Sequence, residues 1–178
     1  MPRKIALALA SALLALPQVA LAAEPPCLTT GEVTALSTYA LPSAISSATR
    51  TCAVSLPADA WLSRNGQDLA ARYSVGRMRA WPAAKAAFLR MSSATNPDAA
   101  QIFSVMPDES LVPVADAALA GIVAAKLKPS ACPTVDRVLS LLAPLPAENT
   151  AELIAMMVGL GSKVGEARLG KFAICKAA

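Results

Sequence analysis

Residues 111–127, LVPVADAALAGIVAAKL, carry the clearest structural signal in this chain of 178 residues. Their apolar side chains recur every three or four positions, which is the period of an amphipathic helix. This face comprises Leu111, Ala115, Ala118, Leu119, Ile122 and Val123. Lys126 lies at the C-terminal end, where the helix dipole favours a cation, and Pro129 cannot continue the helix. Pro113 is expected in the first turn, since a later proline would break the hydrogen-bond ladder.

Helical patterns also occupy most of the chain on either side. Alanine is abundant, aromatic residues make up only 4% of the chain, and runs of β-branched residues are missing, so the composition favours helices. Fourteen prolines and eight glycines interrupt the chain, which limits helix length. Further helices are expected over residues 30–41, 43–51 and 58–74, after Asn96, after Cys132 and over residues 153–160, and one with Pro82 at its first helical position. The predicted fold class is therefore all-α, a compact bundle of several short helices in a single domain over residues 23–178.

Several helix starts have local signals. Thr29 with Glu32, and Asn149 with Glu152, have the spacing of a capping box, in which each residue satisfies a backbone N–H near the other. Asn96 precedes a proline and an acid, which are the residues preferred at an N-cap and a first turn. We therefore expect helices to begin just after these positions.

Pro42 is expected to end one helix and begin the next. Residues 30–41 and 43–51 would then be two helices of similar length with a tight joint, and should form an antiparallel hairpin. Such a hairpin would bring its two outer ends together.

Three other segments carry specific expectations. Asn65–Gly66 is a turn signal that can split the helix over residues 58–74. Residues 153–160 are apolar nearly all round, which is typical of a central helix. In the C-terminal tail, Phe172 and Ile174 alternate with small residues, so a short extended piece is expected there.

Residues 1–22 are predicted to be a Sec-type secretory signal peptide. Arg3 and Lys4 precede an apolar run over residues 5–16, which is too short to cross a bilayer. A small-x-small pattern then ends at Ala22, where cleavage is expected. Loss of the two leader cations lowers the net charge from +4 to +2. The protein is therefore expected in the periplasm or the medium of a bacterium, with no later membrane span and no affinity for nucleic acid.

Four cysteines in an exported chain predict two disulfides, because that compartment is oxidising. The expected hairpin joins Cys27 to Cys52 and leaves Cys132 for Cys175, which makes this the favoured pairing. The alternative is nested, with Cys27–Cys175 and Cys52–Cys132, and would tie the two termini together. No Cys-x-x-Cys spacing indicates a redox role.

The chain contains no histidine, which removes Ser-His-Asp and Cys-His catalysis and histidine metal sites. No metal site, cofactor or catalytic residue is predicted. Carboxylate pairs remain the one catalytic option. The pairs are Asp108 with Glu109 and Glu148 with Glu152.

One segment concentrates positive charge. Its candidate binding residues are Arg64, Arg72, Arg77, Arg79, Lys85 and Arg90, with Asp68 the only acid among them. Trp61, Tyr73, Trp81 and Phe88 interleave with these cations. Arginines beside aromatic rings can bind phosphates or carboxylates. The plainer interpretation is a solvated helix face whose aromatic residues belong to the core.

These observations favour an exported, non-enzymatic protein that binds a macromolecular partner in the cell envelope. The first alternative is attachment to an anionic surface, a lipid head group or a cell-wall polymer, through residues 64–90. The second is a carboxylate-dependent hydrolase.

Overall fold

The computed structural model describes residues 27–164, 168–169 and 172–175. These residues form seven α-helices, one short 3-10 helix and three short strands, so the predicted all-α class is confirmed. The predicted signal peptide lies outside the described residues. The elements are β1 (Cys27–Leu28), α1 (Thr30–Cys52), α2 (Trp61–Ser74), α3 (Arg77–Thr95), α4 (Pro97–Val105), α5 (Asp108–Lys126), η1 (Pro129–Ala131), α6 (Cys132–Leu142), α7 (Ala147–Val164), β2 (Arg168–Leu169) and β3 (Phe172–Ile174).

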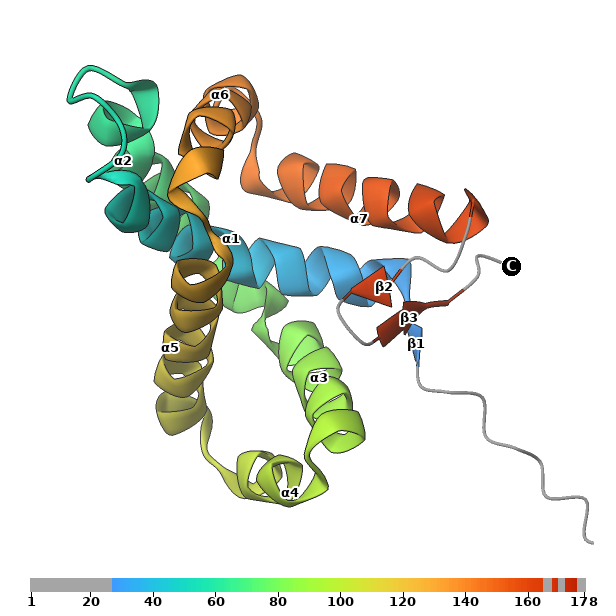
Figure 1. The fold of residues 1–178 in the computed structure, drawn as a ribbon. Helices are drawn as coiled ribbons and strands as arrows, with labels where there is room; N and C mark the ends of the chain where they lie inside the picture. Colours follow the sequence, from blue (N-terminus) through green and yellow to red (C-terminus); the bar gives the residue numbers. More distant parts are fainter. Residues whose placement is uncertain (1–26, 165–167, 170–171, 176–178) are drawn as a thin grey trace, which may run out of the picture.

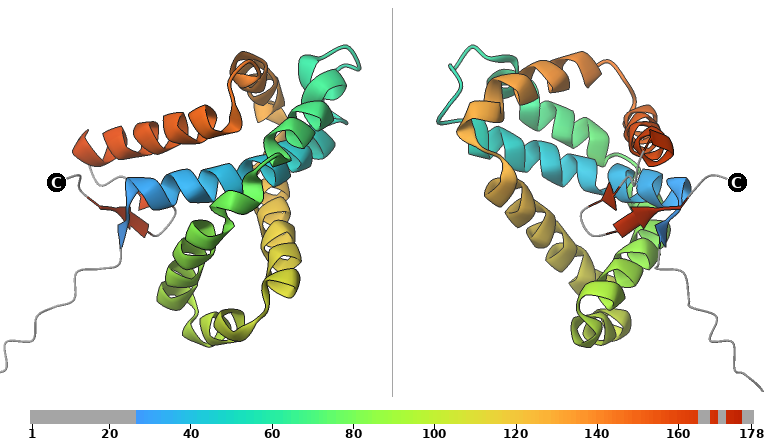
Figure 2. Two further views of the ribbon diagram at one scale, coloured as in Figure 1. Left: turned by 180° about the vertical axis from the view of Figure 1, so that it is seen from behind. Right: turned by 45° about the vertical axis from the view of Figure 1, so that its right-hand side comes forward.

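Helix α1 forms the centre of the bundle. It packs against α2, α3, α5 and α7 (Figure 1). Helix α7 lies alongside α1 and runs in the opposite direction, whereas α3, α4 and α5 make a loop on another side of α1 (Figure 2). A helix with this many neighbours gains most of its stability from packing rather than from its own propensity.

That packing explains why the expected break at Pro42 is wrong. Helix α1 continues through Pro42, which is buried in its middle. A proline inside a helix removes one hydrogen bond and costs about 3 kcal/mol, but an interrupted α1 would lose contacts with several neighbours at once. Pro82 and Pro113 also lie beyond the first turn, each five residues after its helix begins at Arg77 and Asp108. The first-turn placement of these two prolines is therefore wrong as well.

The continuous α1 also overturns the favoured cysteine pairing. Cys27 precedes the 23-residue helix and Cys52 ends it, so at 1.5 Å per residue they lie roughly 35 Å apart. The bonds are instead Cys27–Cys175 and Cys52–Cys132, with Cα–Cα distances of 4.9 and 5.5 Å. This is the nested alternative.

A small sheet secures the C-terminal tail beside the first bond. Strand β3 lies between the other two, parallel to β1 and antiparallel to β2. Cys27 is opposite Ala173, and Leu28 is opposite Ile174. The extended piece expected around residues 172–174 is therefore confirmed, and Cys175 anchors it.

Two of the local start signals are confirmed by hydrogen bonds. The N–H of Glu32 donates to Thr29 Oγ1 at 3.2 Å, and the N–H of Thr29 donates to Glu32 Oε2 at 2.9 Å. The N–H of Ala99 donates to Asn96 Oδ1 at 3.1 Å. The signal at Asn149 is wrong, since α7 already begins at Ala147.

The expected split at Asn65–Gly66 is also wrong, because α2 is continuous. Gly66 is buried in this helix, and a Cβ there would overlap Thr49 Oγ1 of α1. Glycine therefore permits a close approach of α1 and α2 at this position rather than a turn.

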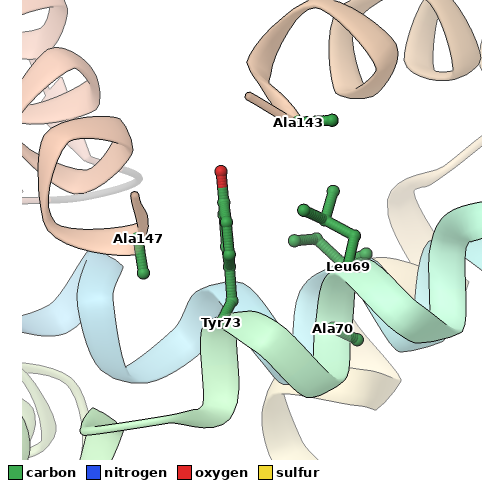
Figure 3. Packing of buried hydrophobic residues seen from close by; sticks show 6 residues of the cluster. Leu69, Ala70, Tyr73, Ala143 and Ala147 are labelled. Atoms are coloured by element: carbon green, nitrogen blue, oxygen red, sulfur yellow. The ribbon is translucent and has the colours of Figure 1, made fainter. Parts of the chain in front are cut away.

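Among the residues that the structure describes, the core is divided among four clusters rather than one. Figure 3 shows one of them, with Tyr73 of α2 between Leu69 and Ala147. The Tyr73 hydroxyl lies 2.8 Å from Thr150 Oγ1, and it is close enough to donate to the carbonyl of Leu145 at 3.1 Å. The aromatic ring is thus buried while its polar end is hydrogen-bonded.

Helix α7 is not the central helix that its apolar sequence predicts. Its small residues Ala151 and Ala155 are buried, whereas four of its large apolar side chains are exposed. The exposed ones are Leu153, Met156, Met157 and Leu160. Among the described helices, no single one is both long and apolar enough to cross a bilayer. Helix α5 and residues Pro129–Leu142 together have that length and apolar composition, but a bend of 91° separates them.

Candidate functional site

An apolar cavity lies between α1, α3 and α5. Its volume is about 420 Å³, which lies within the usual range of roughly 300–1,000 Å³ for small-molecule sites. None of the described residues that line it is charged. We call this the α1–α3–α5 cavity. Its principal walls are Leu36 and Tyr39 of α1, Trp81 and Phe88 of α3, and Leu119 and Ile122 of α5.

Aromatic pairs stiffen two parts of the wall. The ring centres of Tyr39 and Trp81 are 4.7 Å apart, and those of Phe88 and Phe103 are 5.3 Å apart. Both separations suit attractive ring contacts. Leu111 at the base of α5 is fully buried against the first pair. The cavity therefore has a rigid inner wall, while Ile122 at its edge is 59% exposed.

Two ion pairs hold α3 and α5 on opposite sides of this cavity. Arg77 Nη2 lies 2.5 Å from Asp116 Oδ1, and Lys85 Nζ lies 2.6 Å from Asp108 Oδ1. The two pairs are separated along both antiparallel helices, so they fix the spacing and the orientation of the helices together.

The Arg77 pair is the better protected of the two. Its side chain is only 15% exposed, and its guanidinium carbon lies 4.2 Å from the ring centre of Tyr39. Burial alone lowers the pKa of Arg77, but the hydrogen bond and charge of Asp116 outweigh it and the pKa is raised. Ser43 of α1 donates a further hydrogen bond to Asp116 at 3.0 Å. Arg77 thus joins three helices.

The predicted basic segment does not form one cationic patch. Besides Arg77 and Lys85, Arg79 lies 3.6 Å from Glu148 of α7, and Arg90 lies 2.8 Å from Glu32 of α1. Arg72 donates to the carbonyl of Ala143 at 3.1 Å. Five of the six cations therefore have partners within the fold. Arg64 is exposed on α2.

The interleaved aromatic residues belong to the hydrophobic clusters, as the plainer interpretation expects. They are Trp61, Tyr73, Trp81 and Phe88. Since α3 carries four of the cations and each bonds to another helix, the segment acts as a set of interhelical links.

The carboxylate pairs show no arrangement suited to acid catalysis. The hydrogen bond from Lys85 holds the pKa of Asp108 below its ordinary value, which is opposite to the shift that a general acid requires. Glu148 and Glu152 line one shallow groove with Arg79, and Arg79 pairs with Glu148. Asp108 and Glu148 are thus each paired with a cation of α3.

No group of three or more histidine, cysteine or carboxylate residues within the described part of the chain could hold a metal ion. All four cysteines are in disulfides.

The cavity itself was not predicted from the sequence. The only sequence signal for the cavity is an apolar stripe at residues 115, 118, 119 and 122. Such a stripe is equally typical of a packed helix face.

Comparison with protein-family models, with curated proteins and with solved structures found no match.

Proposed function

We propose that this chain is an exported, non-enzymatic binding protein whose ligand site is the α1–α3–α5 cavity. The observation that supports this most directly is an uncharged, largely apolar cavity of about 420 Å³ whose flanking helices are held by ion pairs. An apolar group that binds in this cavity removes apolar surface of both the ligand and the protein from water. Each Å² buried in this way contributes about 25 cal/mol to the free energy of binding.

Packing considerations favour a ligand site over an accidental gap. Protein interiors are close-packed, and side chains normally relax to fill space. Here the large side chains of Trp81, Phe88 and Leu119 surround the cavity without filling it. The Arg77–Asp116 and Lys85–Asp108 pairs link α3 to α5 at two positions beside it. A preformed site of this kind costs little reorganisation when a ligand binds.

The location belongs to the same proposal. Two disulfides are typical of proteins that mature in an oxidising compartment, and the predicted leader supplies a route to the periplasm or beyond. The cell envelope there contains lipids and lipid-bearing macromolecules. These would present the hydrophobic group that the cavity fits, and they are the class of partner that we expect.

A fluorescent apolar probe tests the proposal. The purified protein with both disulfides formed is titrated with N-phenyl-1-naphthylamine, and we expect saturable binding of one probe per chain with micromolar affinity. Ala118→Phe fills an exposed part of the cavity wall and should weaken binding at least tenfold. Ala125→Phe is the matched control, because Ala125 is exposed on the same helix outside the cavity lining. Failure to bind, or equal effects of the two variants, would refute the cavity as the site.

A further inference from the structure

A second apolar surface adjoins the cavity. It has a volume of about 430 Å³ and lies between α1, α5 and α6. Ile122 lines both sites, so the two surfaces meet at this residue. We call the second site the α1–α5–α6 groove. Its lining residues are Leu41, Ala44, Ile45, Ala48, Ile122, Val123, Lys126, Leu127, Val135 and Leu139.

The two sites follow one stripe of α5 and one stripe of α1. On α5, residues 115, 118 and 119 line the cavity, residue 122 lines both sites, and residues 123 and 126 line the groove. On α1, residues 36 and 40 line the cavity and residues 41, 44 and 48 line the groove. This spacing of three and four places each set along one helix face. An apolar path therefore extends from α3 to α6.

Among the described residues that line this path, only one side chain is charged at neutral pH. It is Lys126, at the α6 end of the groove. Four other cations of the fold are in ion pairs, whereas the exposed Lys126 has no ion pair within the described part of the chain. Its long aliphatic stem can extend along apolar surface while the ammonium group stays hydrated. The path therefore ends at a single available positive charge.

The lining is better suited to a hydrocarbon chain than to a peptide. Buried peptide groups need hydrogen-bond partners, and leaving them unpaired is costly. Few polar side chains line the cavity, namely Ser37, Tyr39, Trp81, Ser92 and Thr95. The hydroxyl groups of Tyr39 and Thr95 already donate to the backbone carbonyls of Val112 and Met91, at 3.4 and 3.0 Å. An aliphatic chain has no such groups to satisfy.

We propose, on the basis of the function proposed above, that the ligand is a single-chain anionic amphiphile, with its aliphatic chain along the cavity and groove and its anionic head at Lys126. Fatty acids and lysophospholipids both have this chemistry. Each added CH₂ group should raise the affinity about fourfold until the path is filled. High salt should weaken binding of the anion selectively, since the head group lies at an exposed cation.

Displacement of N-phenyl-1-naphthylamine measures the affinities of dodecanoate, 1-dodecanoyl lysophosphatidate, dodecanol and dodecyltrimethylammonium, all below their micelle concentrations. Both anions should bind at least tenfold more tightly than the cation. Tighter binding of dodecanoate would identify the ligand as a fatty acid, and tighter binding of the lysophosphatidate would identify it as a lysophospholipid. Lys126→Gln should weaken binding of the anions five- to tenfold and leave dodecanol unchanged. Lys128→Gln, an exposed lysine outside both sites, should change neither.

The outcomes separate this inference from the proposal on which it rests. Equal binding of anion, alcohol and cation, or an anion affinity unaffected by Lys126→Gln, would overturn the assignment of the head group while the apolar cavity stands. Loss of all binding would overturn both. A dimer that Ala118→Phe dissociates, together with no amphiphile binding, would identify a second copy of the chain as the occupant and reject the amphiphile.

Discussion

The backbone N–H of Leu62 donates a 2.6 Å hydrogen bond to Oδ1 of Asp136. Leu62 lies in the first turn of α2, where backbone N–H groups have no partner within the helix. Ala60, the N-cap residue, has no side chain that can accept this bond. Asp136 of α6 therefore caps α2 from a distant part of the sequence, and its negative charge also suits the positive end of the helix dipole.

Loss of this cap should destabilise the fold measurably. We expect Asp136→Ala to lower the free energy of unfolding by about 1–2 kcal/mol, which is the usual cost of removing a cap. Asp136→Asn keeps an acceptor oxygen and should recover most of that loss. Urea unfolding followed by circular dichroism measures both. A full loss in the Asn variant would show that charge, rather than the hydrogen bond, is what stabilises α2.

The nested disulfides should contribute strongly to stability because they close long loops. Cys52–Cys132 has a sequence separation of 80 residues, for which the chain-entropy relation gives about 4–5 kcal/mol. The double variant Cys52→Ala/Cys132→Ala should lower the free energy of unfolding by about that amount. Denaturant unfolding at constant pH is the measurement.

Peptide mapping of the oxidised protein supplies the connectivity needed to interpret this variant. Only peptides that join Cys27 to Cys175 and Cys52 to Cys132 are expected. Recovery of a Cys27–Cys52 peptide would contradict the continuous α1 as well as the pairing.

The sequence predicted those features that depend on a few neighbouring residues. The Thr29–Glu32 capping box and the Asn96 cap are local, and both are present. The break at Pro42 was wrong because a proline inside a helix costs about 3 kcal/mol, whereas a break would have cost α1 its contacts with several other helices. Local sequence patterns do not reveal those contacts. The error in the cysteine pairing followed directly from that break.

The cavity could not be predicted from the sequence for a similar reason. An apolar stripe such as Ala115, Leu119 and Ile122 predicts a face turned away from water, but the same stripe suits a packed helix or a cavity wall. The choice depends on how far apart α3 and α5 stand. That spacing is restrained by Arg77 with Asp116 and by Lys85 with Asp108, and no local spacing in the sequence identifies these pairs.

The Lys85–Asp108 pair predicts a specific dependence on pH. The hydrogen bond from Lys85 lowers the pKa of Asp108 in the folded state. A carboxyl group whose pKa is lowered on folding contributes stability above its unfolded pKa, and that stability is lost as the pH falls through the folded pKa. We expect Lys85→Gln to return the pKa of Asp108 towards its ordinary value, as measured by carbon-13 NMR titration of the carboxyl group. Lys128→Gln should leave that pKa unchanged, and an equal shift in both variants would show a general effect of charge.

Two glycines inside helices should respond in opposite ways to the same substitution. Alanine is favoured over glycine in a helix by about 1 kcal/mol. Gly121 of α5 has open space where a Cβ would stand, so Gly121→Ala should raise the free energy of unfolding by about 0.5–1 kcal/mol. At Gly66 of α2 a Cβ would overlap Thr49 Oγ1 and lie 2.9 Å from Leu62 Cδ1. Overpacking of this kind typically costs about 1–3 kcal/mol, so Gly66→Ala should be destabilising despite the better propensity.

A third variant identifies the cause of that destabilisation. Thr49→Ala removes the hydroxyl that the new Cβ would overlap, so the double variant Gly66→Ala/Thr49→Ala should be more stable than the two single effects added together. Denaturant unfolding of the four proteins forms a double-mutant cycle. Simple additivity would mean that α1 and α2 do not approach as closely at Gly66 as the structure has them. A positive coupling would instead establish that α2 is continuous and packed on α1 at the position where its sequence resembles a turn.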